Sequence, residues 1–361
     1  KEIVPDDENS GNGTDAGEEI EIQYGTGVKK VKAASADGPL IPHIPVVTHE
    51  IGQYAVYPNF KEIPKYTGVL KARNFEVFRD NLDKKGMLDQ ADDFFYASGM
   101  LSVQCYKEEL EAAARSSLVA GYQILDLQDF PGQGTALVGI LDAFMDSKGH
   151  ITPEEWAGFC SDAILLAQFE KYVYTSGENF KADLAIRYYN PEKLTGKKLH
   201  YELICRDVSA AETTGFAVNG ETSVVTSGAK ELVQLGGISF AMPETDKTAV
   251  YDLILTIDGT PYKNKYELYC YPVNDDVLSL ENIASIGEGD NQVFITNEFT
   301  ETKSLLKQGK KVLFMPNEVK ESLEGFYCTD FWCYPMFRDI CEWMKKPVAV
   351  GTMGLLIDNR H

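Results

Sequence analysis

A short apolar run that ends in a cluster of polar residues stands out at residues 44–54. Its β-branched Val46 and Val47 favour a strand covered on both faces, and the run is short enough to be one. Thr48, His49 and Glu50 follow at once. A buried parallel strand that ends in ionisable side chains is how a (β/α) barrel presents catalytic groups at its C-terminal face. We therefore expect Glu50 to be a catalytic carboxylate; the alternative is a salt-bridged glutamate at a strand end.

Two amphipathic helices are predicted downstream of this strand. Apolar residues recur at helical spacing within residues 74–85 and again within residues 90–115. In the second helix the pattern places an apolar stripe on one face and three glutamates on the solvent side (Phe94, Ala97, Leu101 and Leu110; Glu108, Glu109 and Glu111).

A second apolar strand is predicted at residues 120–129. Strand, helices and strand make a βαβ unit, in which both strands run parallel and end at the same edge of the sheet. Asp126, Gln128 and Asp129 should therefore lie beside Glu50. They either hydrogen-bond a substrate or hold the loop, and for Asp126 the structural role is favoured.

Aromatic residues gather just beyond the first strand, at Tyr54, Tyr57 and Phe60. Aromatic rings in such a place can stack against the C–H face of a sugar. They can equally pack the loop onto the rim of the sheet, and the pattern does not separate the two interpretations.

Residues 146–155 resemble the second half of a calcium-binding EF-hand loop. With Gly149 at the sixth position, Phe144 and Lys148 fall at the first and fifth, where side-chain oxygen ligands are needed. This excludes calcium. The pattern predicts instead a helix that begins with a capping box and continues through an apolar stripe (Thr152, Pro153 and Glu155; Trp156, Phe159, Ile164 and Leu165).

The second half of the chain has a different pattern of apolar and polar residues. Short alternating segments separated by turn residues predict an antiparallel β-sandwich (residues 180–188, 199–205, 238–242, 250–257 and 266–271). Beyond Pro272, a strand at 293–295, a helix at 300–308 and a strand at 311–315 predict a small α/β unit.

Composition limits the possible partners. The chain has 361 residues, of which 44% are hydrophobic, so it can hold two or three folded domains. Its formal net charge of −21 argues against nucleic acid and anionic membrane surfaces, which need Lys and Arg patches. No run of apolar residues is long enough to span a bilayer. The seven cysteines are scattered, without paired spacing or suitable histidines, so we expect neither a disulfide framework nor a metal site.

Several contiguous segments resemble the glycoside hydrolase family 2-like proteins, the β-galactosidase and β-glucuronidase relatives carried by Bacteroidetes. The segments are residues 49–53, 121–134, 139–144, 269–272 and 351–356. The resemblance implies the C-terminal part of a (β/α)8 TIM barrel at residues 31–171, after an acidic flexible segment at 1–30. An immunoglobulin-like antiparallel β-sandwich at 172–275 and a small, incomplete α/β domain at 276–361 would follow.

The resemblance also implies a function: part of a retaining exo-β-glycosidase that removes terminal β-linked sugars, with no cofactor and with Glu50 as nucleophile. His49 and Gln53 would position the nucleophile or the sugar hydroxyls; for His49 the alternative is a histidine hydrogen-bonded under the loop. Asp126, Gln128 and Asp129 would line the far wall of the sugar pocket, and Tyr54 would also bind the substrate.

The family's acid/base follows an asparagine upstream of the nucleophile, and this chain has no such segment. Its Asn–Glu pairs at 297–298 and 317–318 lie downstream. We therefore expect the chain to be the C-terminal portion of a longer enzyme, inactive alone, which binds its N-terminal portion or a second copy. Relatives of this kind imply a periplasmic or extracellular setting. The competing hypothesis is a non-catalytic carbohydrate-binding or scaffolding protein that kept the frame and lost the chemistry.

Overall fold

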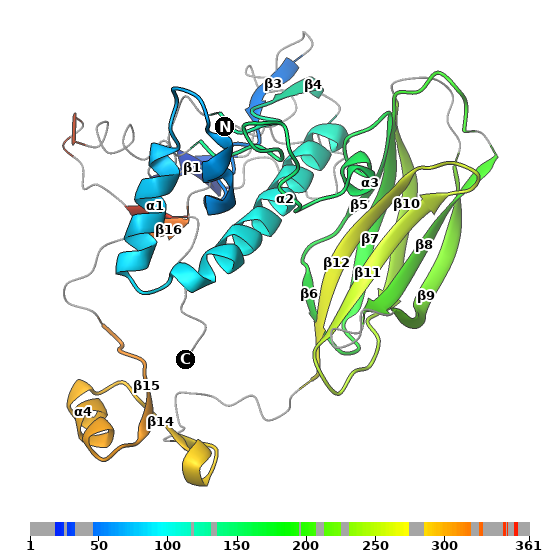
Figure 1. The fold of residues 1–361 in the computed structure, drawn as a ribbon. Helices are drawn as coiled ribbons and strands as arrows, with labels where there is room; N and C mark the ends of the chain where they lie inside the picture. The colour runs from blue at the N-terminus through cyan, green and yellow to red at the C-terminus, as the bar shows by residue number, and fades with distance from the viewer. Residues whose placement is uncertain are drawn as a thin grey trace. The chain divides into compact units, whose positions relative to one another are not determined.

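The computed structural model describes residues 19–24, 27–32, 46–116, 119–130, 136–194, 196–206, 213–224, 231–273, 285–318, 325–327, 342–343, 345 and 350–352 (Figure 1). Most of the acidic segment predicted at residues 1–30, the turn at 131–134 and most of the chain beyond 328 lie outside these ranges. The chain divides into two compact units, Lys1–Pro272 with Gly325–His361, and Val273–Glu324.

The predicted βαβ arrangement around Glu50 is present. Strand β3 (Val46–Ile51) pairs in parallel with β4 (Val119–Ile124), and α2 (Ala91–Arg115) connects them after α1 (Arg73–Lys84). Two short 3-10 helices, η1 (Phe60–Lys65) and η2 (Leu88–Gln90), complete the connection. Among the described strands this sheet has two members, so the rest of a barrel remains a proposal.

Helix α3 (Pro153–Ala157) begins as predicted and ends earlier than predicted. The Thr152 hydroxyl accepts the Glu155 N–H and the Glu155 carboxylate accepts the Thr152 N–H, which confirms the capping box. The predicted continuation through Ile164 and Leu165 is wrong, because both residues belong to strand β5 (Ala163–Gln168). Residues 163–167 are buried without interruption, and such a run has no period that distinguishes a helix from a doubly covered strand.

Two sheets follow and share one core. Their strand orders are β10-β7-β5 and β6-β12-β11-β8-β9, and all neighbours are antiparallel except β6 and β12. The remaining strands are β6 (Val173–Thr175), β7 (Asn179–Tyr188), β8 (Lys197–Arg206), β9 (Thr213–Val224), β10 (Glu231–Ala241), β11 (Ala249–Ile257) and β12 (Lys263–Tyr271). Inward residues of both sheets form the largest core cluster, which includes Phe180, Leu203, Leu253 and Leu268.

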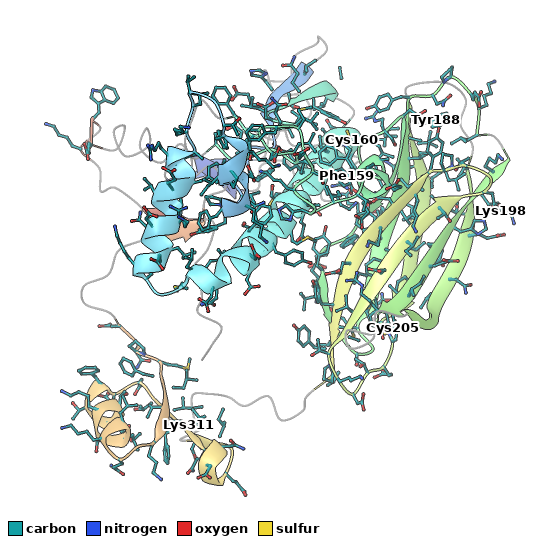
Figure 2. The ribbon with its side chains drawn as sticks, viewed as in Figure 1. Phe159, Cys160, Tyr188, Lys198, Cys205 and Lys311 are labelled. Atoms are coloured by element: carbon teal, nitrogen blue, oxygen red, sulfur yellow. The ribbon has the colours of Figure 1, made fainter. Side chains whose placement is uncertain are left out.

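Helix α2 contacts the β3–β4 pair and strands β5 and β7 of the three-stranded sheet, and Figure 1 draws it between these elements. Phe159 and Cys160, labelled in Figure 2, follow α3 and pack with Leu110 of α2 and Ile51 of β3. At the C-terminal end of α2, Arg187 of β7 donates to the carbonyls of Ala114 (2.7 Å) and Ser116 (2.5 Å). A cation at this end also complements the helix dipole.

The glutamates predicted on the solvent side of α2 are instead engaged. Glu111 is almost fully buried and accepts hydrogen bonds from Lys107 and Arg115 on its own helix and from Asn264 and Tyr266 of β12. The prediction is wrong for Glu111, because strand β12 covers this side of α2 and supplies its partners.

The second unit and two short strand pairs of the first unit complete the described elements. In the second unit, β13 (Ser285–Ile286), β14 (Val293–Thr296) and β15 (Lys311–Phe314) form one sheet, with η4 (Gly289–Asn291) before β14 and α4 (Phe299–Lys307) between the parallel β14 and β15. In the first unit, β1 (Glu19–Tyr24) pairs antiparallel with β2 (Gly27–Lys32), and β16 (Gly325–Tyr327) pairs in parallel with β17 (Val350–Thr352).

Candidate active site at the ends of β3 and β4

Glu50 lies at the carboxyl end of β3, and its side chain is 46% exposed. Its backbone has a φ of +58°, which L-residues other than Asn and Asp seldom adopt. Such a conformation costs about 1–3 kcal/mol and persists only where the surroundings hold it. Here the irregular register between β3 and β4, which falls between Thr48 and Ile51, accompanies the unusual backbone. The strand end is therefore shaped around Glu50.

Two neighbours hold the Glu50 carboxylate. The Gln53 side-chain amide, which is buried, donates to Glu50 Oε2 at 2.8 Å. His49 Nε2 lies 3.6 Å from Glu50 Oε1, and His49 Nδ1 lies 2.7 Å from the Gln123 side-chain oxygen of β4. Because an amide oxygen can only accept, the proton on Nδ1 is fixed by Gln123. The structure thus brings His49 and Gln53 to Glu50.

The turn after β3 is anchored to helix α2. Glu109 Oε2 accepts the Gly52 N–H at 3.1 Å and the Tyr54 hydroxyl at 2.6 Å. The Tyr54 ring meets Tyr106 edge to face, with 5.6 Å between ring centroids. Tyr54 therefore holds the turn through both its ring and its hydroxyl, which favours the structural interpretation of this aromatic residue.

Tyr106 also joins the end of β4 to the same helix. Its hydroxyl lies 3.0 Å from the Asp126 carbonyl oxygen and 2.8 Å from the Val138 carbonyl oxygen. Burial raises the pKa of Tyr106 far above its ordinary value, so it stays a donor. The Leu125 N–H donates to the Ile51 carbonyl at 2.8 Å, which places Asp126 one residue beyond a direct link to β3.

Gln128 and Asp129 lie further along. Gln128 forms an isolated parallel bridge with Leu141. Asp129 is buried, accepts the Gly139 N–H at 2.9 Å and forms an ion pair with buried Lys148 at 2.7 Å. The described contacts of Asp129 are thus structural, and none of them joins it to Glu50.

A buried charge cluster that the sequence did not reveal surrounds this ion pair. Glu62 of η1 is 2% exposed, and its Oε2 has no hydrogen-bond partner. Burial, with the neighbouring Asp129 and Asp142, raises the pKa of Glu62 to about 7, against the opposing effect of Lys148 and Lys65. At neutral pH the group is therefore close to half protonated.

The sequence pattern did not identify Tyr106, Glu109 and Gln123 as residues that hold the ends of β3 and β4 in place. One signal was present: Ser102, Tyr106 and Glu109 fall on the same helical stripe as Leu110. Polar groups on a buried stripe need partners. The choice of partner depends on the packing of α2 against the turn after β3, and the sequence pattern does not contain it.

Glu50 lines neither of two small hollows that lie among the described residues near these elements. The first is bordered by residues of the loop after η1 and of the chain beyond β4 (Tyr66, Leu70, Lys71, Asn74, Asp129, Leu137 and Ala143). The second lies between α2 and the sheets (Glu108, Glu111, Arg115, Ala167, Gln168, Phe169, Glu170, Tyr172 and Tyr266).

Within the described ranges, no group of three His, Cys, Asp or Glu side chains is placed to hold a metal ion. No helix in the same ranges has the length and apolar character needed to cross a membrane.

Comparisons with known proteins give two domain families and distant structural likenesses. A domain of unknown function, DUF8488, matches residues 178–272, and another, DUF8487, matches residues 294–361. No curated protein matches the sequence.

Three solved structures illustrate the likenesses. The sporulation control protein Spo0M from Bacillus subtilis is 13% identical over 32% of this chain and 51% of its own, with a TM-score of 0.23. A β-glucosidase from Listeria innocua (10% identity, 32% of this chain, 17% of its own) and a β-glucuronidase from Parabacteroides merdae (11%, 31% and 14%) both have a TM-score of 0.21. The match spans about half of Spo0M and less than a fifth of each glycosidase. Scores at this level carry no argument about fold or function.

Proposed function

We propose that this chain is part of a retaining exo-β-glycosidase, with Glu50 as the nucleophile. One observation carries the proposal. Glu50 stands at the carboxyl end of one of two adjacent parallel strands, with one oxygen held by Gln53 and about half of its side chain open to solvent. This is where a barrel sheet presents its reacting groups.

The chemistry follows from the orientation of the carboxylate. Gln53 donates to Oε2, so Oε1 is the oxygen left to attack the anomeric carbon. As the bond from Oε1 to that carbon forms, the glycosidic C–O bond breaks and the leaving oxygen takes a proton from a second carboxylic acid. Water then attacks the same carbon, returns a proton to that second group and releases Glu50.

The second carboxyl group must stand about 5 Å from the nucleophile in a retaining enzyme. The described contacts of Glu50 are to His49 and Gln53, and the nearby Glu109 already accepts two hydrogen bonds on one oxygen. We infer that the acid/base comes from another polypeptide segment, either an N-terminal portion of the same enzyme or a second copy. In the assembled site, Asp126 and Gln128 would bind the sugar on the β4 side.

The test is the Glu50→Gln variant of the native full-length polypeptide, assayed on a panel of aryl β-glycosides. Losing the nucleophile should reduce turnover by several orders of magnitude, and the midpoint of thermal unfolding should not change. A 2-fluoro glycoside should add one sugar mass to a peptide containing Glu50. The matched control is Glu154→Gln, an exposed glutamate of α3, which should turn over normally. Near-normal turnover by Glu50→Gln ends the proposal.

A non-catalytic carbohydrate-binding function is the alternative, and one observation favours it: neither described hollow is lined by Glu50. Calorimetric titration with galactose, glucuronate and mannose, run beside the turnover assay on the full-length polypeptide, separates the two. Heat of binding without turnover supports the alternative.

A further inference from the structure

Two tyrosines stand on the outward face of the five-stranded sheet, remote in sequence from Glu50. Tyr269 and Tyr271 of β12 are 36% and 45% exposed. Leu268, which precedes them, and Cys270, which lies between them, are fully buried. Alternate residues of a strand point to the same face and lie about 7 Å apart. The two tyrosines therefore form a pair of side chains on the same face of the sheet, away from the core.

The neighbouring strands extend this pair into a platform. Val173 of β6 pairs with Tyr269 on one side and is exposed, and Val250 of β11 pairs with Tyr269 on the other. Val250 also pairs with Arg206 of β8. Val250 is buried although it alternates along β11 with core residues such as Tyr251. The surface has a solid apolar base.

A hydrogen-bond network fixes one of the rings. The Tyr269 hydroxyl donates to Glu267, and Arg206 donates to Glu267 at 2.6 Å and to Asp252. The hydrogen bond to Glu267, together with burial, raises the pKa of Tyr269 to about 12, so the phenol stays protonated and keeps donating. An aromatic ring held in this way loses little conformational entropy when a ligand stacks on it.

The charges of this face are close to balanced, in a chain whose formal net charge is −21. Arg206 and Lys265 stand against Asp252 and Glu267. A balanced set of charged hydrogen-bonding groups beside exposed rings suits a neutral ligand that has both apolar C–H faces and hydroxyl groups. It offers no field that would attract a polyanion or a polycation.

We propose that the platform formed by Tyr269, Tyr271 and Val173, flanked by Arg206 and Glu267, is a binding surface for a neutral polysaccharide chain. The two rings stack against the C–H faces of neighbouring sugar units, and the charged pair hydrogen-bonds their hydroxyls. The ligand class is shared with the proposed function, but the proposal does not depend on Glu50, because binding to this face needs no turnover.

Affinity electrophoresis in native gels tests the platform. The full chain is run through gels that contain galactomannan, xyloglucan or arabinogalactan, and through a gel with anionic polygalacturonate. At least one neutral polymer should retard the chain, and polygalacturonate should not. Replacing both rings (Tyr269→Ala with Tyr271→Ala) should weaken retardation at least about tenfold, since both stacking contacts are lost.

The matched control is Tyr189→Ala, which removes a tyrosine that is 37% exposed at the end of β7, outside the platform. It should be retarded like the parent chain. Tyr269→Phe keeps the ring and should retain most of the binding. Circular dichroism and thermal unfolding establish that each variant is folded.

Three results would overturn the proposal: no retardation by any neutral polymer, equal retardation of the double variant, or a dimer that the double variant alone abolishes. The last result would show that a second copy covers the face. Failure here is distinguishable from failure at Glu50. The Glu50→Gln variant should still be retarded by the neutral polymer but should lose turnover. The double tyrosine variant should lose retardation but should still turn over a small aryl glycoside.

Discussion

The Glu109 carboxylate of α2 accepts the Tyr54 hydroxyl at 2.6 Å, and the same oxygen accepts the Gly52 N–H at 3.1 Å. One helix side chain thus fixes the turn that begins two residues after Glu50. A hydrogen bond to a charged group contributes about 1.5–3 kcal/mol to stability. The position of the candidate nucleophile therefore depends on a residue that does not touch it.

This relationship predicts a measurable coupling. Tyr54→Phe removes the hydroxyl and should lower the free energy of unfolding by about 1.5–3 kcal/mol, because the Glu109 carboxylate loses a donor in a partly buried place. In a cycle of Tyr54→Phe, Glu109→Gln and the double variant, urea unfolding should give a coupling energy above about 0.5 kcal/mol. Strictly additive losses would contradict the hydrogen bond.

Gly52 should not tolerate a side chain. Its φ is +101°, and a Cβ would lie 1.9 Å from Tyr106 Cε1 in the ring that supports β4. Gly52→Ala should destabilise the chain by about 2–4 kcal/mol, since it combines overpacking with backbone strain. Gly86→Ala is the matched control: its φ is +69°, but a Cβ there meets nothing within 4 Å. It should show the strain alone, about 1 kcal/mol. Equal losses in thermal unfolding would refute the close approach.

The buried Glu62 makes stability depend on pH. Its pKa is raised from 4.5 to about 7 in the folded chain, so the folded state binds more protons than the unfolded state between these values. Stability from this group is complete below pH 4.5 and is lost as pH rises through 7, by up to about 3 kcal/mol. Glu62→Gln should therefore be more stable than the parent at pH 8 and close to it at pH 5.

Urea unfolding from pH 4.5 to 8.5 measures this difference. Glu192→Gln, at an exposed glutamate beyond β7, serves as the control and should leave the pH dependence unchanged. A parent curve that coincides with that of Glu62→Gln at both ends of the range would show that Glu62 is solvated or paired.

Lys148 should be far more important for stability than exposed lysines. It neutralises Asp129 and opposes the charge of Glu62 in a nearly water-free place. Lys148→Met leaves Asp129 as a buried, unpaired charge and should cost about 3–5 kcal/mol. Lys61→Met breaks an ion pair with Asp92 whose side chains are both largely exposed, and should cost less than about 1 kcal/mol. Adding Asp129→Asn to Lys148→Met should restore part of the loss.

Local periodicity predicted the helices well and their surroundings poorly. Helices α1 and α2 begin within one residue of the predicted positions, because their apolar spacing and the stretch between them are visible in the chain. The capping box at Thr152 was equally visible, since its partner stands three residues away. Glu111 was placed in solvent because its partners, Asn264 and Tyr266, are more than 150 residues distant.

At the candidate site, too, contacts between residues close in sequence were predicted and contacts between distant residues were not. Gln53 and His49 lie within three residues of Glu50, and the contacts that hold the carboxylate are local. For Asp129 the sequence left open a sugar contact or a role in holding the loop, and its observed ion-pair partner is Lys148 across a loop. Strand alternation indicates which face a residue takes, whereas the pairing of a buried charge is settled only when the loops close over it.

The guanidinium of Arg187 closes the last turn of α2 from a strand of the neighbouring sheet. A polypeptide shortened to stop ahead of β7 would expose those carbonyls and also strip Glu111 of its amide and phenol donors. Heating should accordingly unfold the segment that carries Glu50 and the two sheets together. Trimming the chain to the segment around Glu50 would then yield an unfolded polypeptide.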